Sequence, residues 1–113
     1  MGKGGGASGA RGGGGGGGGR PLSAQEITQE RSKIDSQGFS KKGPNDWEFV
    51  TDPKTGIGAS ITKETAGSIT QYAVQTWSRN DISITRTFNT LNKAKTAAKE
   101  EMKGWLPSVK VKG

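Results

Sequence analysis

Apolar and polar positions alternate along the middle of the chain with the two-residue period of β-strands. The longest such segment runs from Ile69 to Trp77, and neither of its two faces is wholly apolar. The same alternation predicts three further strands, over residues 47–51, 57–61 and 82–88. Residues that favour turns separate the four segments, at 52–56, 64–68 and 78–81. Because short turns join successive strands, the pattern predicts a four-stranded antiparallel meander.

A different spacing follows the last predicted strand. Apolar residues recur there every three or four positions, as on one face of a helix: Leu91, Ala94, Ala98, Met102 and Trp105. Thr90 is a good N-cap, and Gly104 with Pro107 marks an end, so we expect a helix over residues 91–103. We expect Met102 and a buried Trp105 to anchor this helix on the sheet.

A first helix is predicted before the strands. Ser23 and Glu26 have the spacing of a capping box, which satisfies two free backbone N–H groups at a helix start. A helix over residues 24–36 follows, and its narrow apolar face, with Ile27 and Ile34, suits packing at an edge. The polar residues 40–46 contain a glycine and a proline and are predicted to form a loop.

Together these elements predict an α+β fold: a helix, a four-stranded antiparallel meander and a C-terminal helix packed on one face of the sheet. Residues 1–20 hold 13 of the 20 glycines and predict a disordered Gly-rich tail. Residues 21–107 then form a single domain. We expect residues 108–113 to be a frayed C-terminus, with a short edge strand as the alternative.

The composition bears on the kind of partner. The chain carries 17 Lys and Arg against 10 Asp and Glu, a net charge of +7, which attracts polyanions such as nucleic acid. The alternative is that the lysines mainly keep a small domain soluble. There is no histidine and no cysteine, so the common acid–base group and the common zinc ligands are missing. We therefore expect no enzyme activity, no metal and no cofactor.

The sequence also bears on location. It contains no apolar run of eighteen residues and no apolar signal-peptide core, so we expect no membrane partner and a cytoplasmic location. The oligomeric state is left open.

The candidate binding residues are lysines on the predicted second helix and in the predicted loop. They are Lys93, Lys95, Lys99, Lys103, Lys41 and Lys42. We expect the four helical lysines to lie on or beside the exposed side of the helix, whose N-terminus adds partial positive charge suited to phosphate. Trp77 and Tyr72 point to opposite faces of their strand, so one of them is a candidate for stacking on bases, against the alternative that both fill the core.

From Ile57 onward, three strands and a helix that opens at Thr90 resemble the second half of a double-stranded RNA-binding domain. In the helix, Ala94 and Lys95 match that family's Ala-Lys pair, although Leu91 and Asn92 stand where the family has two lysines. The resemblance implies binding of RNA through phosphates and shape. The segment 52–56 and the ending 87–91 also resemble the DNA-binding arm domain of phage-type integrases, and the Gly-rich start is similar to accessory proteins of tailed phages. An unrelated small α+β fold remains the alternative.

The sequence therefore predicts a non-enzymatic nucleic-acid-binding module that uses a basic C-terminal helix on RNA or DNA phosphates. The alternative is a protein-interaction or assembly accessory protein, of the phage-encoded kind, whose exposed sheet face meets another protein.

Overall fold

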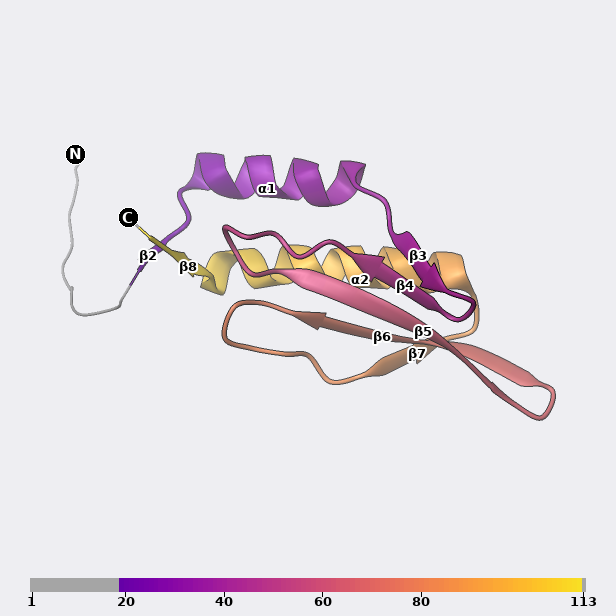
Figure 1. Ribbon diagram of the computed structural model, residues 1–113. Helices are drawn as coiled ribbons and strands as arrows, with labels where there is room; N and C mark the ends of the chain where they lie inside the picture. Colours follow the sequence, from indigo (N-terminus) through magenta and orange to yellow (C-terminus); the bar gives the residue numbers. More distant parts are fainter. Residues whose placement is uncertain (1–18, 113) are drawn as a thin grey trace.

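A five-stranded antiparallel sheet carries one helix on its face, and a second helix packs beside the first (Figure 1). This computed structural model describes residues 19–112. The sheet order follows the chain: β3 (Ser40–Gly43), β4 (Asp46–Phe49), β5 (Gly58–Ala66), β6 (Ile69–Trp77) and β7 (Arg86–Phe88). The helices are α1 (Ala24–Ser36) and α2 (Leu91–Trp105), and α2 continues into the short 3-10 helix η2 (Leu106–Ser108). The α+β class and the packing of the C-terminal helix on the sheet are confirmed.

The strand count of the sequence prediction was wrong, because the predicted loop over residues 40–46 contains a fifth strand. In this β3–β4 hairpin Lys41 lies opposite Trp47, and Gly43 lies opposite Asp46. Gly43 is the last residue of β3 and Pro44 follows it in the turn, so the proline interrupts no ladder. Lys42 has no partner in the register, which shifts between Lys41 and Gly43.

The predicted strand over residues 82–88 is also shorter than expected. Only Arg86–Phe88 pairs continuously with β6, and Ile82 forms a single bridge with Trp77. Between these points the Ser83 hydroxyl accepts a hydrogen bond from the Thr76 N–H at 2.9 Å, so a side chain replaces a carbonyl of the ladder. Ile84 lies in the part of this segment that is not paired as a strand and is largely exposed.

The core lies between the sheet and α2. On β6, Val74 and Thr76 have no exposed surface, so the face that they share is the one packed against α2, a choice that the alternation left open. Ala94, Ala98 and Met102 of α2 have no exposed surface, as their spacing predicted. The small side chains of Ala94 and Ala98 allow the helix to approach the strands closely.

The end of α2 differs from the prediction. Gly104 lies inside the helix without a positive φ, and the chain continues through Trp105 into η2, so Gly104 does not end the helix. Trp105 is half-buried rather than fully buried. Its indole N–H donates a hydrogen bond to the Thr76 hydroxyl at 3.0 Å.

The two ends of the described chain form a ribbon. β2 (Arg20–Pro21) pairs antiparallel with β8 (Lys110–Val111), and Val109 and Val111 are only 4% and 3% exposed. The sequence predicted that residues 108–113 would fray, with a short strand as the alternative. Lys110 and Val111 form such a strand, and the buried Val109 and Val111 hold it on the core. Arg20, which was assigned to the tail, is part of the ribbon, and residues 1–18 lie outside the described part of the chain.

The capping box at the start of α1 is confirmed, and it belongs to a larger network. Glu26 accepts a hydrogen bond from the Ser23 N–H at 2.9 Å, and the Glu26 N–H donates to the Ser23 hydroxyl at 3.1 Å. The same carboxylate pairs with Arg20 at 2.6 Å and with Lys54 at 2.8 Å. It therefore joins the ribbon, α1 and the β4–β5 connection.

We expect Glu26→Gln to reduce the sensitivity of the protein to acid. Hydrogen bonds from Arg20, then Lys54, hold the pKa of Glu26 well below its usual value. A carboxyl whose folded pKa is depressed stabilises the fold above its unfolded pKa, and that contribution is lost as the pH falls further. The urea midpoint of the wild type should therefore fall more between pH 7 and pH 3 than that of the variant.

Glu48→Gln is the matched control, because among residues 19–112 the exposed Glu48 has no cation partner. Its acid response should equal that of the wild type. An equal response of Glu26→Gln and the wild type would contradict the assigned role of Glu26.

Candidate nucleic-acid interface

The four helical lysines of the sequence prediction occupy two different environments. Lys93 is exposed and lines a shallow hollow with Phe88, Asn92, Thr96 and Ala97. Lys95, Lys99 and Lys103 are half-buried. Of these four lysines, which were expected on or beside the exposed side of the helix, only Lys93 is therefore fully exposed.

The packing of α1 against α2 explains the difference. Lys99 donates to the Asp35 carbonyl at 2.9 Å, and Lys103 pairs with the Asp35 carboxylate at 2.8 Å. Lys103 also pairs with Glu100 at 3.0 Å. These hydrogen bonds raise the pKa of Lys103, so its charge is held between the two helices rather than offered to a ligand. Lys99 and Lys103 act as contacts between α1 and α2.

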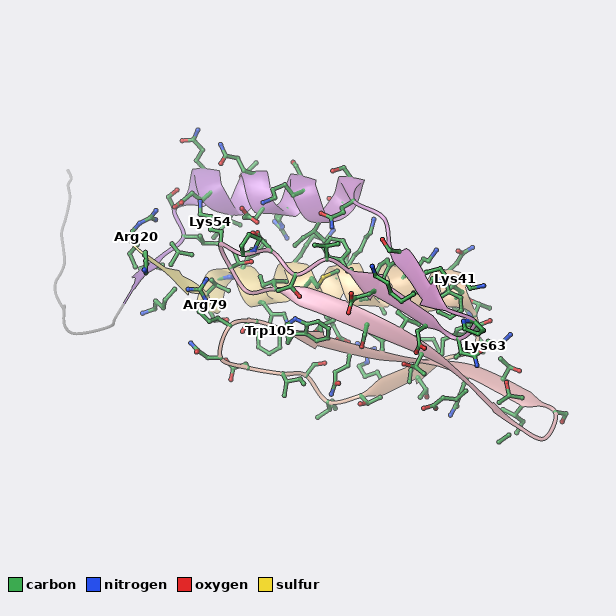
Figure 2. The ribbon with its side chains drawn as sticks, in the orientation of Figure 1. Arg20, Lys41, Lys54, Lys63, Arg79 and Trp105 are labelled. Carbon is green, nitrogen blue, oxygen red and sulfur yellow. The ribbon has the colours of Figure 1, made fainter. Side chains whose placement is uncertain are left out.

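A basic and aromatic cluster lies on the α2 side of the sheet. The rings of Trp47 and Tyr72 meet edge to face with centroids 6.0 Å apart, and the Lys41 ammonium lies 5.6 Å from the Trp47 centroid. Lys63 stands opposite Tyr72 in the register and shares a face with Ile61, two residues earlier. Figure 2 shows Lys41 and Lys63 at the same end of the fold.

Sequence reasoning missed Lys63. Lys63 directly precedes residues 64–68, which were predicted to form a turn, so it was not assigned to a strand. In the structure β5 continues to Ala66. Had the strand been extended by two-residue alternation from Ile61, Lys63 would have been placed on the helix side of the sheet. The sequence signal for the true position of the turn was the Gly67–Ser68 pair, since glycine readily adopts the positive φ that hairpin turns require. In the structure Gly67 has a φ of 62°.

The β3–β4 hairpin and the first turns of α2 lie at the same end of the molecule (Figure 1), and five lysines belong to these elements and to the adjoining part of β5. We call this set the basic end: Lys41, Lys42, Lys63, Lys93 and Lys95. In the described part of the chain none of the five has a carboxylate within ion-pair distance. Their charge is therefore not neutralised within residues 19–112.

The opposite face of the sheet is polar and carries acidic residues. Strand alternation places Asp46 and Glu48 on the face opposite Trp47, and Glu64 on the face opposite Lys63. The amide of Gln71 donates to Glu64 at 3.3 Å on this outer face. At this end of the sheet the acidic side chains therefore lie on the face opposite Lys41 and Lys63.

The two stacking candidates of the sequence analysis occupy opposite faces, and both are half-buried. Trp77 lies on the outer face and donates its indole N–H to the Thr51 hydroxyl at 3.2 Å. Tyr72 lies on the α2 side in contact with Trp47. The geometry of the basic end therefore favours contacts with phosphates over insertion between bases.

The described residues offer little for other chemistry. Within residues 19–112 there is no group of three or more His, Cys, Asp or Glu side chains that could hold a metal ion. A search of the same residues for a helix with the length and apolar character needed to cross a membrane finds none. Comparisons of the chain with family models, with curated proteins and with solved structures gave no match.

Proposed function

We propose that this chain is a non-enzymatic module that binds the phosphate backbone of a nucleic acid through the basic end. The observation that carries the proposal is the charge separation across the sheet. Lys41 and Lys63 of the sheet and Lys93 and Lys95 of α2, none with a carboxylate partner in the described chain, lie on one side, and Asp46, Glu48 and Glu64 lie on the other. A phosphate backbone neutralises such lysines and releases its own counterions, which favours binding.

The first turn of α2 supports the same proposal. Thr90 caps the helix, and its hydroxyl accepts a hydrogen bond from the Lys93 N–H at 3.1 Å. The other backbone N–H groups at the helix start have no intrahelical partner, and the helix dipole adds partial positive charge there. Lys93 stands beside this terminus, so a phosphate there meets both an ammonium group and the positive end of the helix.

The contacts available at the basic end read the backbone rather than the bases. Lysines bind phosphates as mobile point charges, and the neighbouring rings of Trp47 and Tyr72 are half-buried. We therefore propose binding with little sequence preference, to RNA or DNA.

The experiment that tests the proposal is a salt titration of binding, followed by fluorescence anisotropy on labelled duplex RNA and duplex DNA. Affinity should fall steeply between about 50 and 200 mM salt. Lys41→Gln and Lys63→Gln should each reduce the slope of log K against log salt by about 0.9 on duplex DNA, since each removes one phosphate contact. The double variant should lose about twice as much.

Arg31→Gln is the matched control for the single variants. Arg31 is an exposed cation of α1 outside the basic end, and it has no carboxylate partner among residues 19–112. Its removal changes the net charge equally and should leave the slope almost unchanged. Equal effects of all three variants would show general charge attraction without a site, and no binding at about 50 mM salt would refute the proposal.

Protein interaction is a second candidate function, favoured by one observation. Ile82 and Ile84 are 63% and 81% exposed beside the edge strand β7. Exposed isoleucines next to an unpaired strand edge suit contact with another protein. Binding to such a partner would depend weakly on salt, which separates the two candidates in the same titration.

A further inference from the structure

A second group of cations surrounds a shallow hollow at the end of the fold where β2 and β8 pair. The hollow has a volume of about 350 Å³ and is lined by Pro53, Lys54, Arg79, Val111 and Lys112. Its three cations come from three separate segments: the β4–β5 connection, the loop after β6 and the end of the ribbon. Figure 2 shows Lys54 and Arg79 near Arg20 at this end, away from Lys41 and Lys63.

The position of Arg79 is fixed by the fold. Its Nη2 donates to the Pro53 carbonyl at 3.0 Å and to the Lys54 carbonyl at 2.8 Å. Gly56 allows this approach, because its φ is 72° and a Cβ there would lie 2.7 Å from the Arg79 Cα. The two loops are thus joined by backbone contact and by the guanidinium group, whose remaining N–H donors stay available at the hollow.

The charge around the hollow is strongly positive. Arg20 and Lys54 share the single carboxylate of Glu26, at 2.6 and 2.8 Å. In the described chain Arg79 and Lys112 have no carboxylate within ion-pair distance. The four cations and one carboxylate leave a net charge of +3. Asp81, in the same loop as Arg79, is exposed and does not line the hollow.

We infer that this hollow binds a phosphate group. A tetrahedral phosphate presents oxygens in several directions, which matches donors that arrive from three segments, whereas a carboxylate presents two oxygens in one plane. A guanidinium held by backbone carbonyls loses little further freedom when it binds an oxyanion. The phosphate belongs either to a nucleic-acid backbone or to free phosphate, and the site itself does not depend on the function proposed for the basic end.

The test uses the full chain, labelled with ¹⁵N, and inorganic phosphate at constant ionic strength and pH 7. Amide resonances of residues 53–56, 79–81 and 111–112 should shift and saturate. Lys112→Gln should weaken this binding by roughly fivefold, in line with an exposed charge contact. Lys112 makes no hydrogen bond with other residues of the 19–112 segment, so its replacement leaves the loops intact, unlike Arg79→Gln.

Arg31→Gln again serves as the control and should bind phosphate like the wild type. Shifts that do not saturate, or equal affinity in Lys112→Gln and the wild type, would overturn the inference. A second arm uses a ten-residue thymidine oligonucleotide without terminal phosphates. If it shifts the same amides, the site takes backbone phosphates; if only inorganic phosphate does so, the site takes free phosphate. Shifts with inorganic phosphate but none with the oligonucleotide would leave the phosphate site standing, and the duplex titration described above tests the proposed function separately.

Discussion

Met102→Ala is expected to lower the free energy of unfolding by about 2–5 kcal/mol, the range for truncating a fully buried methionine. Met102 has no exposed surface and belongs to the cluster that joins α2 to the sheet. Its neighbours on the buried stripe are Ala94 and Ala98, which cannot extend to fill the space left behind. The cavity should therefore persist in the variant.

Urea denaturation followed by circular dichroism measures this loss. Small domains bury a limited fraction of their surface, so a change of this size removes much of the total stability. Thr96→Ala, an exposed change on the same helix, is the control and should stay within about 0.5 kcal/mol of the wild type. A loss below about 1 kcal/mol for Met102→Ala would show that the helix is not anchored at this position.

Thr76→Val is expected to cost about 1–3 kcal/mol although it preserves the shape of the side chain. The Thr76 hydroxyl is fully buried, accepts from the Trp105 indole at 3.0 Å and donates to Glu101 at 3.2 Å. Glu101 in turn pairs with Arg86 at 2.6 Å. Valine would leave the indole N–H and one carboxylate oxygen without this partner in a partly buried position.

A second replacement identifies the source of the loss. Trp105→Phe removes the indole donor and keeps an aromatic ring, and its effect should not add fully to that of Thr76→Val because both break the same hydrogen bond. The double-mutant cycle, measured by urea denaturation, should therefore show a coupling energy above about 0.5 kcal/mol. Full additivity would contradict the hydrogen bond between Thr76 and Trp105.

Local signals in the sequence predicted the helices well. The capping box of Ser23 and Glu26 and the bounds of α1 are confirmed, because capping chemistry acts within four residues. The buried stripe of α2 is confirmed at Ala94, Ala98 and Met102, because helical spacing alone defines which residues share this face. The longest strand, Ile69–Trp77, also has the predicted bounds.

Features that depend on distant contacts were not predictable. β3 was missed for a different reason: it pairs with the neighbouring β4 across a short turn, but its sequence has no apolar alternation. The burial of Thr76 depends on Trp105 and Glu101, which are 29 and 25 positions away. The ribbon of β2 and β8 joins residues that are about ninety positions apart, which no local pattern can show.

The candidate site was predicted in part. Lys41, Lys42, Lys93 and Lys95 belong to the basic end, whereas Asp35 of α1 engages Lys99 and Lys103. Helical spacing showed which lysines lie outside the apolar stripe but not that a second helix covers one flank. The resemblance to double-stranded RNA-binding domains stays a prediction, as does the nature of the nucleic acid.

The pairing of Arg20 with Val111 has a consequence for the connectivity of the domain. Since these residues are neighbours across a ribbon, a short glycine linker could join them and the chain could be opened at the exposed turn of Gly67 and Ser68. The circularly permuted chain would begin with β6 and end with β5, turning their local hairpin into a pairing between its two termini. If it still folds, the native contacts define this domain independently of the order in which the chain supplies its elements.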